Sequence, residues 1–328
     1  MDSQSFLLPI RIATRGVFVF DMKKNIARHQ RSLPPQRSRK GQFGIVMRGP
    51  HGDESLTERP NPEIAICGIL LHPAGHTRSP AMHNAAYRAC DLRAVYHAFD
   101  VKPERLALAL DEARARGMKQ LAVSIPHKEA VMEHLDQVDE TARSIGACNT
   151  VTLREGALVG QNTDWTGALE AVRREIEPEG REAVVLGAGG AARAVVYGLL
   201  QAGARVSILN RTEARAGELA TQLGAHGSGK LDELGDLQPE IIINTTSVGL
   251  RSDVSPVSES ALPASAVVMD AVYDPEKTRL LRDAEARGAR PLSGKWMLIH
   301  QAAEQFSLWT GIEAPISVMG RAFDAAGP

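Results

Sequence analysis

The stretch Val184-Val-Leu-Gly187-Ala-Gly189-Gly190-Ala-Ala192 decides the fold of one half of this chain. An apolar run typical of a buried strand leads directly into a glycine-rich turn and then into an alanine-rich helix. Gly187 permits the tight turn, Gly189 lets the backbone approach a pyrophosphate, and Ala192 allows close packing of helix against strand. Because the first N–H groups of the helix are free to bind phosphate, this pattern in this context predicts a dinucleotide site. The residues expected to contact the cofactor here are Gly187, Ala188, Gly189, Gly190 and Ala191.

The end of the next predicted strand indicates which dinucleotide is bound. An NAD site usually carries Asp or Glu there, about twenty residues after the glycines, to hold the ribose 2′-hydroxyl. This chain has Asn210-Arg211-Thr212 instead, with Arg215 nearby. Arg211 can donate paired hydrogen bonds to a 2′-phosphate, and Asn210 and Thr212 add neutral ones. The sequence therefore predicts NADP(H).

Working outward from this turn, strand-like and helix-like segments alternate through both halves of the chain. In the second half, strands are expected at 183–186, 206–209, 241–243 and 267–269, with a helix at 191–202. In the first half, strands are expected at 64–70, 95–99 and 120–125, with helices at 81–90 and 103–116. This order predicts an α/β fold with parallel sheets and right-handed crossovers. The two units are expected to meet near residues 165–174 and to leave a cleft between them.

Composition excludes several classes of protein. The chain has 328 residues, a formal net charge of −1 and three cysteines. No excess charge would attract nucleic acid or an anionic membrane, and no apolar run reaches the roughly 18 residues of a membrane span. The cysteines (Cys67, Cys90 and Cys148) share no metal-binding spacing, so we expect no metal site and a cytoplasmic protein.

The first 62 residues differ from the rest because they are basic and contain Pro34-Pro35. One interpretation is an organelle-targeting presequence. The other is a disordered extension, or translation begun upstream of the natural start, with Met22 or Met47 as later starts. The weak helical period and the proline pair favour the second interpretation. We expect no catalytic role for this segment.

Three polar clusters follow predicted strands of the first half, where sites in open α/β sheets usually lie. Thr77 and Ser79 stand two residues apart, so that both hydroxyls can face one side of a loop. The second cluster contains Ser124, near the end of the strand predicted over 120–125, and Lys128, which is expected in the first turn of the helix that follows, where the helix dipole disfavours a cation. The third cluster comprises the segments 146–150 and 160–164. A cation placed against the dipole suggests a functional role.

Together these segments resemble the shikimate dehydrogenases, which reduce 3-dehydroshikimate to shikimate with NADPH. The resemblance runs from about Ile64 to Phe323. It rests on His76–Pro80, Val123–Lys128, Asn149-Thr150, Asn162–Asp164, Gly187–Ala194, Asn210–Thr212, Asn244–Gly249, Val272–Pro275 and Met297–Phe306.

The resemblance implies a substrate domain over 63–166 and a Rossmann-type NADP domain over 167–296. The C-terminal helix, 297–325, would cross back to complete the first domain. Lys128 and Asp164 would form the catalytic acid–base pair, a role that agrees with the proton needed when a ketone is reduced. The substrate would be bound by Thr77, Ser79, Ser124, Asn149, Tyr273 and Gln301. Thr245 and Ser247 would add cofactor contacts.

The sequence departs from the family pattern at three positions. It has Thr77 where the family usually has Ser, Ser124 where it has Thr, and Ala122 where it has Asn. The substrate is expected to be shikimate or 3-dehydroshikimate, and the alternative is a related enzyme acting on quinate or another ring acid. A second alternative is a non-catalytic NADP(H)-sensing protein, although such relatives should lose the Lys128–Asp164 pair first. The sequence contains no pattern that separates a homodimer from a monomer.

Overall fold

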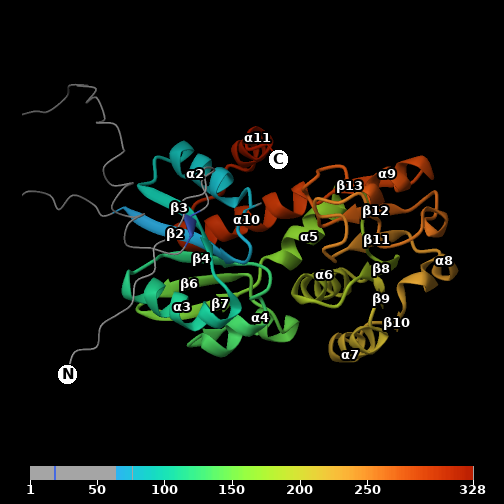
Figure 1. Cartoon of the computed structure of the whole chain (residues 1–328), viewed down its shortest axis with the longest axis horizontal. Helices are drawn as coiled ribbons and strands as arrows, with labels where there is room; N and C mark the ends of the chain where they lie inside the picture. Colours follow the sequence, from blue (N-terminus) through green and yellow to red (C-terminus); the bar gives the residue numbers. More distant parts are fainter. Residues whose placement is uncertain (1–17, 20–63, 76, 328) are drawn as a thin grey trace, which may run out of the picture.

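Two β-sheets lie on either side of helices α5 (Asp164–Arg173) and α10 (Lys295–Thr310) in this computed structural model (Figure 1). The structure describes residues 18, 19, 64–75 and 77–327. Apart from Phe18 and Val19, the predicted basic extension over 1–62 lies outside the described residues, as does His76 of the first polar cluster. None of the described helices is long and apolar enough to cross a membrane.

The first lobe is built on a seven-stranded sheet. In spatial order its strands are β1 (Phe18–Val19), β3 (Ala94–Asp100), β2 (Ala65–Leu71), β4 (Gln120–Val123), β6 (Thr150–Arg154), β7 (Ala157–Gln161) and β5 (Gln137–Val138). The first four strands are parallel, as predicted for this half. A hairpin of β6 and β7 then adds antiparallel pairs beside β4, which the sequence analysis did not anticipate. The sheet is therefore mixed, because a hairpin joins antiparallel strands without a crossover helix.

The second lobe is built on a six-stranded sheet that is parallel throughout. In spatial order its strands are β10 (Gly227–Gly229), β9 (Arg205–Leu209), β8 (Glu182–Leu186), β11 (Ile241–Asn244), β12 (Val267–Asp270) and β13 (Arg290–Ser293). This is the strand order of a dinucleotide-binding Rossmann sheet. Ile241, Ile242 and Ile243 are fully buried, as expected of a strand with helices on both faces.

Helices and short 3₁₀ turns connect these strands. The α-helices besides α5 and α10 are α2 (Ser79–Ala89), α3 (Leu106–Ala115), α4 (Glu140–Ile145), α6 (Gly190–Gln201), α7 (Glu213–Leu223), α8 (Leu234–Leu237), α9 (Arg279–Ala286) and α11 (Ile316–Ala325). The 3₁₀ turns are η1 (Pro103–Arg105), η2 (Ala130–His134), η3 (Leu231–Glu233) and η4 (Glu259–Ala261). The helix predicted over 103–116 is thus divided between η1 and α3.

Helix α10 follows the second lobe in the chain but packs into the first (Figure 1). Its buried Ile299 and Phe306 join the core formed by β2, β3, α2 and α11. On another side it crosses α5 closely, because Gly167 has no side chain: a Cβ there would lie 2.8 Å from both Met297 O and Gln301 Cβ. This crossing fixes the start of α5 against the middle of α10. The predicted domain boundary at 166/167 falls inside α5, and the single C-terminal helix predicted over 297–325 is wrong, because the chain there forms two helices, α10 and α11, separated at Gly311.

Candidate active site

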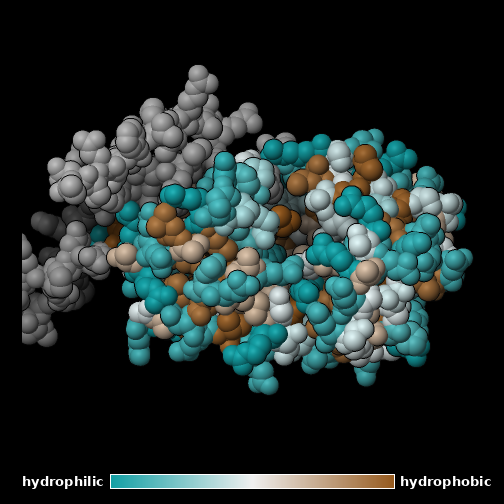
Figure 2. Space-filling view, turned by 60° about the horizontal axis from the view of Figure 1, so that its bottom comes forward, coloured by the Kyte–Doolittle hydropathy of each residue, from teal (hydrophilic) through white to brown (hydrophobic). Residues whose placement is uncertain are grey.

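A pocket of about 160 Å³ lies between the two lobes, where the space-filling surface is hollowed (Figure 2). Residues from the ends of first-lobe strands, from α10 and from second-lobe loops line it. All eight residues predicted to act on or bind the substrate are among them: Thr77, Ser79, Ser124, Lys128, Asn149, Asp164, Tyr273 and Gln301. The structure therefore brings together side chains that are up to 224 positions apart in the sequence, from Thr77 to Gln301.

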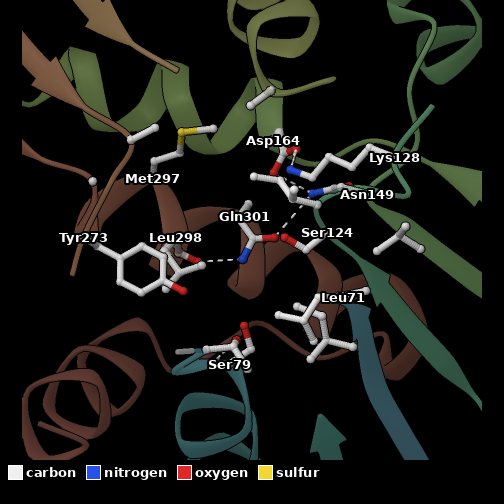
Figure 3. A pocket seen from close by; sticks show the side chains of 18 of the residues that line it. Leu71, Ser79, Ser124, Lys128, Asn149, Asp164, Tyr273, Met297, Leu298 and Gln301 are labelled. Atoms are coloured by element: carbon white, nitrogen blue, oxygen red, sulfur yellow. Dashed lines mark hydrogen bonds and ion pairs between the residues drawn. The ribbon is translucent and has the colours of Figure 1, made fainter. Parts of the chain in front are cut away.

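Lys128 and Asp164 meet at one side of this pocket (Figure 3). Lys128 Nζ lies 2.5 Å from Asp164 Oδ2, and the side chains are only 14% and 6% exposed. One prediction about Lys128 is wrong. It lies in a turn two residues before η2, not in the first turn of an α-helix, so the argument from the helix dipole does not apply. A nearly buried ion pair at the wall of a pocket is nevertheless a strong candidate for proton transfer.

Asp164 is held in place by a network of amides. As the first residue of α5, it donates its backbone N–H to Asn162 Oδ1 at 2.9 Å. Asn149 Nδ2 donates to Asp164 Oδ1 at 2.8 Å, while Thr163 N–H donates to Asn149 Oδ1 at 2.7 Å. One carboxylate oxygen thus faces an amide and the other faces the ammonium, so the carboxylate has little freedom to turn.

Helix α10 contributes two glutamines one turn apart. The Gln301 side chain lies in the middle of the pocket (Figure 3), where its Oε1 accepts from Asn149 Nδ2 at 3.3 Å and its Nε2 donates to Leu298 O at 2.8 Å. Gln305 also lines the pocket. Sequence reasoning missed Gln305, although its i,i+4 spacing from Gln301 places both on one helix face and could have indicated it.

The opposite side of the pocket carries hydroxyl groups. Ser79 and Tyr273 approach it from different lobes, with Ser124 on the side of Lys128 (Figure 3). Burial raises the pKa of Tyr273 to about 12, against the opposing effects of the Thr77 hydroxyl and the Arg78 charge. The phenol therefore stays protonated at neutral pH and can donate a hydrogen bond.

The second lobe presents the predicted glycine turn to this pocket. Gly187 adopts a φ of +116°, and Gly189 is the residue before α6. No side chain caps that helix, and its first turn has no acidic residue. A Cβ on Gly189 would meet nothing within 4 Å, whereas one on Gly190 would lie 2.9 Å from Lys128 Cβ. An open, uncapped helix start beside the lysine fits a pyrophosphate group.

The remaining predicted cofactor residues occupy different positions. Ala191 and Ser247 line the pocket, while Ala188 is buried at the turn. Thr245 Oγ1 donates to Leu186 O at 2.7 Å, so its hydroxyl braces the glycine turn. At the far end of β9, Arg211, Thr212 and Arg215 are exposed, and Asn210 Nδ2 donates to Thr212 O at 2.9 Å.

A second-lobe arginine forms a hydrogen bond to the first lobe. Arg251 donates to Asp274 Oδ2 at 2.9 Å through Nε and to Gly75 O, in the first lobe, at 3.2 Å through Nη2. Its neighbour Leu250 lines the pocket. Sequence reasoning did not identify Arg251, and an isolated surface arginine after a loop carries no signal by itself.

Three family models match successive parts of the chain. They describe a shikimate dehydrogenase substrate-binding domain over residues 69–151, a shikimate/quinate 5-dehydrogenase over 170–254 and a shikimate 5′-dehydrogenase C-terminal domain over 294–322. The last match includes α10, which supplies Gln301 to the pocket.

Relatives cover the same region. The shikimate dehydrogenase (NADP(+)) of Pyrococcus abyssi is 45% identical over 79% of this chain and 97% of its own length. The shikimate 5-dehydrogenase of Thermus thermophilus, solved with NADP(H) and shikimate, is 40% identical with a TM-score of 0.75, over 80% and 99% of the two chains. The quinate dehydrogenase of Corynebacterium glutamicum, solved with NAD, is 30% identical with a TM-score of 0.72, over 80% and 99%. The chain belongs to the shikimate dehydrogenase family.

Proposed function

We propose that this protein is an NADP-dependent shikimate dehydrogenase that reversibly reduces 3-dehydroshikimate to shikimate. The observation that carries the proposal is the contact of 2.5 Å between Lys128 and Asp164 inside a pocket that also borders the glycine turn. The product would serve the biosynthesis of aromatic amino acids, and the three unpaired cysteines favour the cytosol as the compartment.

In this mechanism Lys128 moves a proton at the reacting oxygen of the substrate. When bound, NADPH would supply a hydride, which carries the two electrons and the hydrogen that the carbonyl carbon gains. As negative charge grows on the carbonyl oxygen, the Lys128 ammonium donates a proton to it, and in the reverse direction the amine takes that proton back. Asp164 keeps the ammonium directed into the pocket and accepts a hydrogen bond from a ring hydroxyl.

The other lining residues suit a polyhydroxylated acid. Thr77, Ser79 and the Tyr273 phenol would bind the carboxylate from one side, while Ser124, Asn149 and Gln301 would bind ring hydroxyls from the other. A site built from hydrogen-bonding groups rejects analogues that lack the matching hydroxyls, because its own polar groups would then stay unpaired in a dry pocket.

The second lobe would hold NADP by two features. Gly187, Ala188, Gly189, Gly190 and Ala191 would place the pyrophosphate at the start of α6, with Thr245 and Ser247 beside them. Arg211, helped by Asn210, Thr212 and Arg215, would bind the 2′-phosphate. No acidic residue occupies the segment 210–212, and an exposed guanidinium there is free to form a bidentate contact.

Quinate is the competing substrate, since the Corynebacterium relative is a quinate dehydrogenase. Quinate carries an additional hydroxyl on the carbon that bears its carboxylate. The extra methyl group of Thr77, compared with serine, reduces the room at the hydroxyl-bearing side of the pocket. We therefore expect kcat/KM to be higher for shikimate than for quinate, and higher with NADP than with NAD.

The decisive experiment is the Lys128→Met variant, which keeps the aliphatic stem and removes the proton donor. We expect turnover of shikimate with NADP to fall by about 10²–10⁴-fold, with NADP affinity by calorimetry nearly unchanged. Lys119→Met is the matched control, because Lys119 is an exposed lysine of the same lobe outside the pocket. Unchanged turnover in Lys128→Met would exclude Lys128 as the donor, and a purified chain that binds NADP without oxidising shikimate or quinate would favour the sensing protein.

A further inference from the structure

Gln305 lies at the wall of the substrate pocket, one helical turn after Gln301, and is only 1% exposed. Its Nε2 donates to two acceptors at the start of β6: Asn149 O at 3.2 Å and Thr150 Oγ1 at 3.0 Å. Both N–H bonds of the amide are therefore used at the corner that carries Asn149. Gln305 contacts the part of the first lobe that orients the catalytic carboxylate.

The Thr150 hydroxyl connects Gln305 to the side chain of Asn149. Since its oxygen accepts from Gln305, its own hydrogen is directed elsewhere, and it donates to Asn149 Oδ1 at 2.8 Å. The Thr163 N–H donates to the same oxygen. Thr163 Oγ1 is a third and more distant donor to Oδ1, at 3.3 Å. With the two short donors on Oδ1, the amide of Asn149 has one stable orientation, in which Nδ2 faces Asp164 Oδ1 at 2.8 Å.

The surroundings of Gln305 keep it in this position. The His83 ring is fully buried, stacks on Tyr96 with centroids 4.2 Å apart, and has its pKa lowered to about 3 by burial, an effect that Gln305 opposes. A neutral ring carries no charge that would draw the amide away from Thr150. On the pocket side, Ala122 is the register partner of Thr150. Directly opposed residues of an antiparallel pair share one face, so this small side chain leaves room for Gln305.

We propose that Gln305 is a positioning residue for the Lys128–Asp164 pair, acting through Thr150 and Asn149. The inference rests on the proposed function of that pair. Without the two N–H groups of Gln305, the Thr150 hydroxyl is free to rotate and Asn149 loses one of the two short hydrogen bonds that fix its amide oxygen. Asp164 then loses part of a hydrogen bond that favours its ionised, lysine-facing state.

The test is Gln305→Met, which keeps the length of the side chain and removes both donors. Displacement of the acid–base pair should lower kcat for shikimate about tenfold, because small misplacements at the reacting centre are costly. KM and the Kd for NADP should stay within about twofold, since both binding surfaces remain. The acidic limb of the kcat profile against pH should move to higher pH, because the carboxylate is less well stabilised.

Gln120→Met is the matched control. Gln120 is a fully buried glutamine of β4 whose amide atoms have no hydrogen-bond partner among the described residues, and it lies outside the pocket. This variant should change thermal stability but leave kcat and the pH profile as they are. Thr150→Val removes the next donor without changing shape, so it should reproduce the pH shift. The double variant should then add little to either single one.

Two results would overturn the inference. A higher KM with kcat and the pH profile intact would make Gln305 a substrate ligand, and a variant indistinguishable from Gln120→Met would make it a core residue only. If Gln305→Met does not fold, Thr150→Val carries the same test. Failure of the proposed function is separate, because it would appear in the unmodified protein as absent shikimate oxidation or in Lys128→Met as unchanged turnover.

Discussion

The two lobes line the pocket with different chemical groups. The first lobe, with α5 and α10, uses buried side chains: Asn149, Thr150, Thr163, Asp164 and Gln301 bond to one another at the wall. The second lobe presents mainly backbone, in the form of a glycine turn and the open start of α6. A site made of side chains depends on which residues are present, whereas a site made of backbone depends on which side chains are missing.

This difference predicts the largest effect at Gly187. Gly187→Ala should destabilise the fold by about 3–5 kcal/mol, because a Cβ would lie 2.7 Å from Thr245 Oγ1 at a φ of +116°.

Gly189→Ala should lower the free energy of unfolding by less than about 1 kcal/mol, since its Cβ would meet nothing within 4 Å. It should instead weaken NADP binding about tenfold or more, because the methyl group occupies the space of the pyrophosphate. Denaturant unfolding and calorimetric titration of both variants check this. Equal losses of stability would contradict it.

The second prediction concerns a buried side-chain cluster that the second lobe does contain. Asp270 accepts hydrogen bonds from Thr278 Oγ1 at 2.7 Å, Asn244 Nδ2 at 2.8 Å and Val272 N–H at 3.0 Å. Burial nevertheless raises its pKa from 3.8 to about 6, against the effect of these bonds. Between these two values the folded state binds more protons than the unfolded state. The contribution of Asp270 to the free energy of unfolding is therefore largest in acid and falls as pH rises through about 6.

Asp270→Asn should remove this dependence. Because the variant does not titrate, its cost in unfolding free energy should be greater near pH 4 than near pH 7, by up to about 3 kcal/mol. Chemical denaturation of both proteins across this range measures the difference. A cost that does not change with pH would show that the carboxylate stays ionised in the fold, and that this cluster behaves like the polar wall of the first lobe.

The smallest effect tests the one place where the second lobe is expected to recognise a ligand by a charged side chain. Arg211→Ser should lower kcat/KM for NADP by about 10–100-fold, because a charge-assisted pair with the 2′-phosphate is lost. The kcat/KM for NAD should hardly change. Parallel kinetics with both cofactors give the ratio of the two kcat/KM values, and Arg205→Ser is the control, because Arg205 is an exposed arginine at the opposite end of β9 from Arg211. A preference that survives in Arg211→Ser would move 2′-phosphate recognition to Arg215 or to the backbone.

The two halves differ in the kind of strand that their sequence failed to predict. In both halves every predicted strand appears within a residue or two of its observed bounds, since buried parallel strands are continuous apolar runs. In the second lobe only the short edge strands β10 and β13 were not predicted. In the first lobe the hairpin of β6 and β7 was missed. Its strands, Thr150–Arg154 and Ala157–Gln161, mix polar and apolar residues, and their antiparallel pairing with β4 depends on tertiary contacts.

The residues that line the candidate pocket were predictable, while the hydrogen bonds among them were not. The sequence indicated Lys128 and Asp164 as partners, and the structure places them in contact. The prediction that Lys128 lies in the first turn of an α-helix was wrong. A strand followed by apolar residues has the same sequence pattern before a 3₁₀ turn as before an α-helix. The hydrogen-bond partners of Gln305 and Arg251 are distant in sequence, so those contacts have no local signal; only the i,i+4 spacing of Gln305 from Gln301 could have indicated the glutamine.

The return of α10 to the first lobe has a consequence for synthesis of the protein. The ribosome releases residues 295–310 only after the whole second lobe has been made, so Asn149 and Thr163 lack the glutamine-bearing helix that covers them while that lobe is translated. Until then the core around Tyr87 and Tyr96 lacks Phe306 and stays open to solvent. A ribosome-bound chain that stops before residue 295 should therefore present a folded second lobe attached to an unfinished, protease-sensitive first one.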